Sequence, residues 1–238
     1  MNSPLVTPPL FHIGPVPVTE PVVTTWGIMA LLVVGSLAVS RHLTRNVPGR
    51  LQACLELLVT TLDTQITSTM RVEDPAPYRA FVGTLFVFIL VANWCALLPG
   101  IAAPTATLAT DAALAGLVFL AIIVFGIRSG GVGGYLRTFL WPSIVMVPLN
   151  LLGTVTRTFS LMVRLFGNVM AGAFVIGIVL SLAGLLVPIP LMALDMLTSA
   201  VQAYIFAVLA MVFIGSALSR PTASPAASTN PDRTGVSP

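Results

Sequence analysis

Five apolar stretches, each able to enter or cross a lipid bilayer, most constrain what this chain can fold into. The hydrocarbon core takes about 20 helical residues, and its lack of water forces each crossing segment to satisfy its own backbone hydrogen bonds. With 56% hydrophobic and only 8% charged residues, the chain does not have the composition of a soluble domain. We therefore expect an all-α integral membrane protein with five membrane-embedded helices, at residues 26–40, 80–98, 108–127, 143–186 and 191–218.

A sixth segment, residues 50–71, has a different pattern. Its polar residues Gln52, Glu56 and Asp63 lie off an apolar stripe with three-to-four spacing, formed by Leu51, Leu55, Leu58, Leu62 and Ile66. Such a helix lies along a membrane surface or packs against a partner. A connecting helix in the aqueous phase remains the alternative.

The arginines predict the orientation, because basic residues concentrate in cytoplasmic loops. Every basic residue is an arginine; none lies in the first 25 residues, at 99–107 or near the turn at 187–190. We expect an extracytoplasmic tail at 1–25, a membrane domain at 26–218 with its surface helix on the cytoplasmic side, and a disordered cytoplasmic tail at 219–238. The loop and tail arginines are Arg41, Arg45, Arg50, Arg71, Arg79, Arg128, Arg137, Arg220 and Arg233.

The fourth stretch is too long for one straight crossing. A helix over 143–186 would extend roughly 66 Å at 1.5 Å per residue, about twice the hydrocarbon thickness. The fifth stretch also exceeds one crossing, and the sequence Val-Pro-Ile-Pro at 187–190 separates the two. We expect a long, steeply tilted helical hairpin.

A polar stripe runs along the fourth stretch. At about 100° per residue, one face carries Asn150, Gly153, Arg157, Ser160, Arg164, Asn168 and Ala171. A charge at the bilayer centre costs between about 3 and 17 kcal/mol, so Arg164 is expected to be functional. The alternatives are that Arg164 pairs with a fixed acid to lock two helices together, and that Arg157 only reaches the lipid headgroups.

The fifth stretch carries a matching stripe of Asp195, Thr198, Ser199 and Gln202. Asp195 follows the turn closely and would lie near the outer surface, with Gln202 about 10 Å deeper. This spacing suggests a hydrated path from the outside toward the helix centre. The alternative is that Asp195 is a solvated acid of the turn.

Two motifs resemble one known family. Residues 160–172 read SLMVRLFGNVMAG, similar to the signature SLxxRLFGNxxAG of F-type ATP synthase subunit a, and residues 202–206 read QAYIF, similar to its QAFIF. Weaker similarity includes Glu56-Leu-Leu, residues 81–93, Leu98-Pro-Gly and Pro148-Leu-Asn, so the resemblance covers about 50–218.

The resemblance implies a location in the bacterial inner membrane, with the c-subunit ring, the peripheral-stalk b subunits and the rest of the F1Fo complex as partners. Two offset half-channels would carry H⁺ to and from the ring carboxylates and couple ion flow to rotation. Arg164 would be the stator arginine facing those carboxylates, while the ion pathway would include Gln202, Asn168, Asp195, Ser199, Ser160 and Arg157. No cofactor or metal is implied. A Na⁺-translocating variant stays open.

Three positions depart from the family pattern. Ala173 stands where many members carry an acid or His, Thr154 stands near another missing acid, and Thr107 replaces the acid of Pro-x-x-Asp-x-Asn. Asp195, where relatives place Glu or His, would then carry the outer pathway nearly alone.

Other classes fit the sequence less well. A stand-alone channel or transporter would be expected to show internal repeats, and a haem subunit would need intramembrane histidines, whereas His12 and His42 lie outside the expected spans. The isolated Cys54 and Cys95 suggest packing rather than metal or redox chemistry. A pure structural anchor would not need Arg164. A net charge of +3 does not indicate nucleic-acid binding, and no nucleotide motif is present, so any ATP chemistry belongs to partner subunits.

Overall fold

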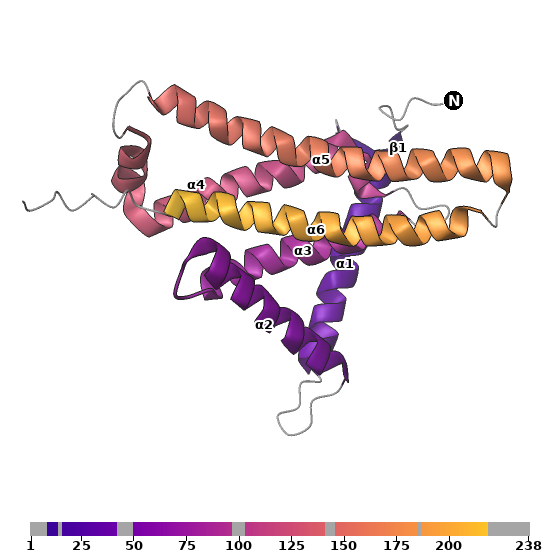
Figure 1. Ribbon diagram of the computed structural model, residues 1–238, viewed down its shortest axis with the longest axis horizontal. Coiled ribbons are helices and arrows are strands. Elements are labelled where there is room, and N and C mark those ends of the chain that lie inside the picture. Colours follow the sequence, from indigo (N-terminus) through magenta and orange to yellow (C-terminus); the bar gives the residue numbers. More distant parts are fainter. Residues whose placement is uncertain are drawn as a thin grey trace, which may run out of the picture.

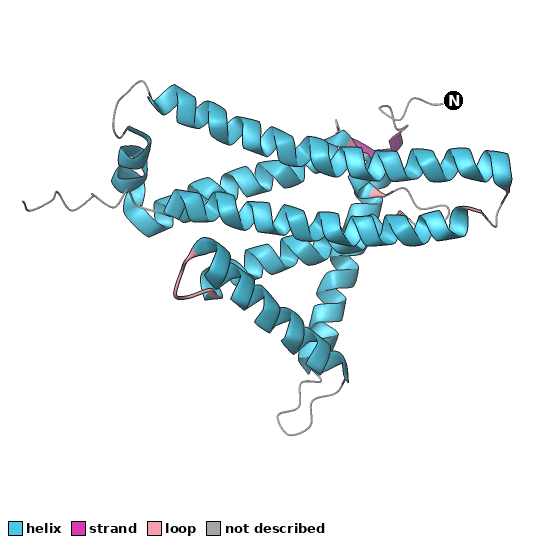
Figure 2. Ribbon diagram, viewed as in Figure 1, coloured by secondary structure: helices cyan, strands magenta, loops and turns pink. Residues whose placement is uncertain are grey.

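The computed structural model describes residues 9–13, 16–41, 50–96, 103–140, 146–184 and 187–218. A short hairpin, β1 (Pro9–Ile13) and β2 (Val16–Thr19), precedes a chain of helices (Figures 1 and 2). These are α1 (Glu20–Arg41), α2 (Arg50–Met70), α3 (Ala76–Cys95), the 3-10 turn η1 (Pro104–Ala106), α4 (Leu108–Leu140), α5 (Met146–Ala183) and α6 (Pro188–Leu218).

The expected fold class is confirmed. The helices α1, α3, α4, α5 and α6 each contain a segment long and apolar enough to cross a membrane. The antiparallel strands at the N-terminus are the one addition, and they lie within the tail predicted at 1–25. The predicted tail at 219–238 lies outside the described residues.

Helix α1 begins at Glu20, earlier than the expected start at residue 26. The intervening residues include Thr24 and Thr25, which look polar in the sequence. In the helix, Thr24 Oγ1 donates to the Glu20 carbonyl at 3.1 Å and Thr25 Oγ1 to the Pro21 carbonyl at 2.7 Å. A hydroxyl that donates to a carbonyl one turn earlier is compatible with an apolar helix. Pro21 is also compatible with the first turn, because a backbone N–H at this position has no partner within the helix.

Helices α5 and α6 form the predicted hairpin, running antiparallel along the long axis of the molecule (Figure 1). At 1.5 Å per residue, α5 and α6 extend about 57 and 46 Å, well beyond a hydrocarbon core of about 30 Å. Gly184 follows α5 with φ +73°, which favours glycine because it has no Cβ. A second break occurs inside α4 at Gly131, with φ 70° and ψ 166°.

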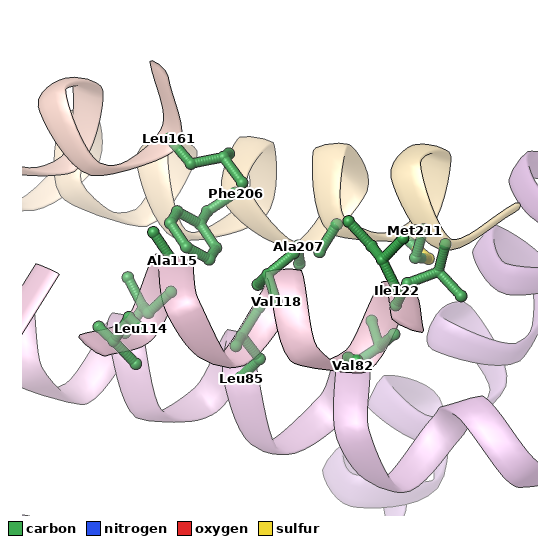
Figure 3. Packing of buried hydrophobic residues seen from close by; sticks show 14 of the residues in the cluster. Val82, Leu85, Leu114, Ala115, Val118, Ile122, Leu161, Phe206, Ala207 and Met211 are labelled. Atoms are coloured by element: carbon green, nitrogen blue, oxygen red, sulfur yellow. The ribbon is translucent and has the colours of Figure 1, made fainter. Parts of the chain in front are cut away.

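The core joins α3, α4, α5 and α6. Phe206 of α6 lies between Leu161 of α5 and Ala115 of α4, while Val118 meets Leu85 of α3 (Figure 3). These side chains are almost fully buried. Helix α6 packs against α2, α3, α4 and α5, so its position is fixed by four neighbouring helices.

Helix α2 packs against α3 and α6 and lies at an angle to the long helices (Figure 1). Only part of its predicted apolar stripe is covered: Ile66 is buried and Leu62 half-buried, whereas Leu55 is exposed. Arg79 of α3 forms an ion pair with Asp63 of α2. Cys54 is exposed, so the interpretation of this cysteine as a packing residue was wrong for the chain alone.

Candidate functional site

Arg164 lies on an exposed apolar surface of α5. One side of the helix is held against the bundle by Leu161, Leu165 and Val169, which are buried and spaced four residues apart. Large apolar side chains on α5 remain exposed along most of its length, namely Leu152, Val155, Phe159, Val163, Phe174, Val175, Ile178, Leu180 and Leu182. Arg164 is therefore an exposed charged residue among exposed apolar side chains, and the described part of the chain does not cover it.

Arg164 has no acidic partner among the residues that the structure describes. The ion pair between Arg79 and Asp63 is the sole one found in this part of the chain. The acids described are Glu20, Glu56, Asp63, Glu73, Asp74, Asp111 and Asp195, and Asp232 alone lies outside. The structure thus gives no support to the alternative that a fixed acid on another helix of this chain pairs with Arg164.

Arg157, two turns before Arg164, has a different environment. Its Cζ lies 5.5 Å from the ring centroid of Phe213 on α6, a cation–π geometry, and the side chain is otherwise exposed. Ser160 is exposed on the same helix. The side chain of Asn150, the first member of the predicted stripe, lies outside the described part of the structure.

Two side-chain amides of the hairpin have a buried donor nitrogen with no partner among the residues that the structure describes. Gln202 of α6 is 6% exposed and its Nε2 is unpaired, and Nδ2 of Asn168 on α5 is likewise buried and unpaired. Ser199 is also buried, at 3% exposed. Buried polar groups in proteins normally find a protein or water partner, so these donors are suited to bind water or an incoming group.

The predicted stripe on α6 divides in the structure. Asp195 is half-buried and points into the hairpin, as Ser199 and Gln202 do, whereas Thr198 is exposed and donates from Oγ1 to the Asp195 carbonyl at 3.0 Å. Trp94 Nε1 of α3 donates to the Met196 carbonyl at 3.3 Å, which fixes this turn of α6 against α3. Thr198 is therefore not part of the same inward-facing set.

Sequence reasoning overlooked the most deeply buried acid. Asp111, in the first turn of α4, is 0% exposed, and both its carboxylate oxygens lack a hydrogen-bond partner. The signal was visible, since an acid at the start of an apolar stretch is unusual. No group of three or more His, Cys, Asp or Glu side chains that could hold a metal ion occurs in the described residues.

Comparisons with known proteins agree on one family. The profile described as ATP synthase A chain matches residues 22–215. The chain is 54% identical to ATP synthase subunit a 2 of Bradyrhizobium sp. strain BTAi1, over 91% of this chain and 96% of the relative. Identity is 45% to ATP synthase subunit a of Albidiferax ferrireducens, over 82% and 85% of the two chains, and 39% to ATP synthase subunit a 1 of Hahella chejuensis, over 99% and 100%. The chain therefore belongs to the family of ATP synthase subunit a, as a multi-pass membrane subunit of the Fo sector involved in ion transport and ATP synthesis.

Proposed function

We propose that this chain is the stator half of a rotary ion motor in which Arg164 faces the carboxylates of a turning c-subunit ring. The supporting observation is an exposed, intramembrane arginine that has no acidic partner in the described chain, on a helix with a broad exposed apolar face. A charge in hydrocarbon needs compensation, and a carboxylate delivered by another subunit would provide it. An apolar ring surface would cover the side chains around it.

Arg164 would act through its fixed positive charge. A nearby cation favours the ionised form of a carboxylate, so a ring carboxylate that approaches Arg164 would release its ion. The same charge repels free cations, which would prevent direct leakage past the stator. Arginine suits this role because it does not lose its proton at any working pH. Each carboxylate must then unload before passing and reload afterwards, which couples ion flow to rotation.

Asp195, Ser199, Gln202 and Asn168 would line the half-channel between the hairpin turn and Arg164. Their polar atoms lie in the α5–α6 hairpin, where the unpaired amide donors of Gln202 and Asn168 can hold water. Arg157 and Ser160 would serve the pathway on the opposite side of Arg164. We place the N-terminus outside and the C-terminus in the cytoplasm, following the arginine distribution. The peripheral-stalk b subunits would hold this chain against rotation.

The deciding experiment compares Arg164→Ala with Arg128→Ala in complexes reconstituted into liposomes. Arg128 is also an exposed arginine, at the end of the α4 span, and serves as the matched control. We expect Arg164→Ala to abolish ATP-driven ion uptake and to increase passive ion leak, with Arg128→Ala close to wild type. Normal coupled uptake in Arg164→Ala would overturn the proposal. Measuring uptake with and without Na⁺ would distinguish H⁺ from Na⁺ as the carried ion.

A further inference from the structure

Three fully buried polar side chains at one end of the bundle have no hydrogen-bond partner among the described residues. They are Asn93, at 1% exposed, and Thr105 and Asp111, each at 0%. The unpaired atoms are both amide atoms of Asn93, the Thr105 hydroxyl and both Asp111 carboxylate oxygens. Isolated unpaired groups occur in native proteins, but three of them from neighbouring elements need an explanation.

The register of the helices brings these residues to the same level. Helices α3 and α4 are antiparallel, and at one end the ring of Tyr78 lies 5.0 Å from that of Phe125. Asn93 follows Tyr78 by about 15 residues and Asp111 precedes Phe125 by about 14, so each lies roughly 22 Å along its helix from that contact. The turn η1, which carries Thr105, contacts both helices.

The buried faces of the two helices support the same arrangement. Asn93 continues the face of α3 that includes Leu85 and Ile89, and Asp111 continues the face of α4 that includes Leu114 and Val118. Leu85 and Val118 meet in the core (Figure 3). Ile89 and Leu114 lie one turn further toward the end of the bundle, and Asn93 and Asp111 form the layer beyond them. This layer is polar where the layers below it are apolar.

An unpaired buried carboxylate is costly, and proteins avoid it by binding a proton or a cation. No basic side chain in the described chain pairs with Asp111. The nearby hydroxyls of Thr107 and Thr110 bond to each other at 2.9 Å, and Asp111 accepts nothing from them. Carboxylate, amide and hydroxyl oxygens are the ligands that hard cations prefer, and the same atoms can hold a transferable proton.

We propose that Asn93, Thr105 and Asp111 form a binding site for a monovalent cation, either H⁺ or Na⁺, on the ion path. The site rests on the proposed function and adds a second acid beside Asp195. Trp94 and Met196, the neighbours of Asn93 and Asp195, are joined by a hydrogen bond, so the site and Asp195 lie at the same end of the bundle. Asp111 lies one turn after Thr107, the position where the family pattern has an acid, and its N–H donates to the Thr107 carbonyl at 3.3 Å.

The test uses the whole complex in liposomes and compares Asp111→Asn, Asp111→Glu and the double variant Thr107→Asp/Asp111→Asn. Glu20→Gln is the control, because it makes the same chemical change at an exposed acid. We expect Asp111→Asn to lower ATP-driven cation uptake at least about tenfold, the lower end of the cost of losing a positioned transfer or ligand-orienting group. Asp111→Glu and the double variant should recover most of the rate, since each keeps a carboxylate within one helical turn.

The two cations give different results. For Na⁺, Asp111→Asn raises the Na⁺ concentration that gives half-maximal uptake of radiolabelled Na⁺. For H⁺, the loss appears in Na⁺-free buffer, as reduced quenching of a pH-sensitive dye, and Na⁺ does not change it.

Uptake by Asp111→Asn at the rate of Glu20→Gln would overturn the site. If the complex with Asp111→Asn does not assemble, the double variant Thr107→Asp/Asp111→Asn tests the site instead. Assembly with near-normal uptake supports the site, whereas assembly without uptake, or no assembly, shows a structural role and overturns it. Arg164→Ala, measured in parallel, separates the two proposals. Loss of uptake there with normal uptake in Asp111→Asn removes only the site, and normal uptake in Arg164→Ala removes the proposed function.

Discussion

Asp195 of α6 packs its carboxylate directly against the backbone of Gly172 of α5. A Cβ at position 172 would lie 2.8 Å from Asp195 Cγ, closer than real Cβ contacts, and 3.2 Å from Oδ2, tighter than most of them. The glycine therefore holds the space that this carboxylate occupies, and it determines how closely the two helices approach beside the acid. The Asp195 carboxylate can occupy this position only because residue 172 has no side chain.

Replacing Gly172 by alanine should displace Asp195 without unfolding the protein. The added methyl meets the end of a short side chain, which can rotate away, and alanine favours helix over glycine by about 1 kcal/mol. We expect ATP-driven ion uptake to fall roughly tenfold, because a displacement of about 1 Å at a transfer site can cost up to about a hundredfold.

The control for this prediction is Gly116→Ala on α4, where an added Cβ would meet nothing within 4 Å. Uptake rates of the two variants are compared in vesicles with equal amounts of assembled complex. Equal rates would show that the position of the Asp195 carboxylate does not limit transport.

Much of the fold follows from the sequence because the bilayer leaves few alternatives. The apolar stretches predicted the spanning helices, and the excess length of the last two predicted the hairpin of α5 and α6. The buried residues Leu161, Leu165 and Val169 repeat every four positions along α5, as expected for one side of a helix. These features depend on period and length, which a sequence displays directly.

Burial was less predictable, because it depends on which neighbour covers a given face. Thr198 and Ser199 are adjacent and both polar, yet Ser199 is buried between helices and Thr198 is exposed. Asp111 stands at the start of an apolar stretch, but its full burial depends on the elements that pack around the first turn of α4, including η1. The start of α1 was missed because threonine looks polar until its hydroxyl bonds to the preceding turn.

The ion pair between Asp63 and Arg79 should fix the angle of α2 on α3. Its side chains are 26% and 40% exposed, so water screens the pair and its contribution is about 0.2–1 kcal/mol. We expect Asp63→Asn to speed amide hydrogen exchange in the C-terminal half of α2. The charge swap Asp63→Arg with Arg79→Asp should restore slow exchange. An unchanged exchange rate in Asp63→Asn would mean that apolar packing around Ile66 alone holds the helix.

The contact of Arg157 with Phe213 should couple α5 to α6 at the end away from their turn. Cation–π contacts of exposed arginines contribute about 0.5–1 kcal/mol. We expect a double-mutant cycle of Arg157→Gln and Phe213→Leu, measured by thermal unfolding in detergent, to give a coupling energy in this range. Arg164, for which the described part of the chain shows no such aromatic contact, should show no coupling to Phe213. A coupling near zero for Arg157 would indicate that the ring is incidental.

Two glycines that face α2, Gly215 and Gly83, should differ in how much stability the protein loses when each is replaced by alanine. At Gly215 of α6, an added Cβ would lie 3.2 Å from Met70 Cα, a backbone atom, whereas at Gly83 of α3 it would lie 3.3 Å from Leu62 Cδ1. The end of a leucine side chain can move at little cost, but a backbone atom moves only with its helix. We therefore expect Gly215→Ala to lose about 1–3 kcal/mol of stability through overpacking.

Gly83→Ala should be close to neutral, because the helix preference of alanine offsets the small shift of Leu62 by up to about 1 kcal/mol. Chemical unfolding in mild detergent, with α2 followed by a fluorophore attached to the exposed Cys54, would measure both variants on one scale. If Gly83→Ala were the more damaging, the α2–α3 contact rather than the α2–α6 contact would hold α2 in place. Since α6 carries Asp195, Ser199 and Gln202, the predicted order would mean that the helix we propose to line the ion path is also the one that α2 supports.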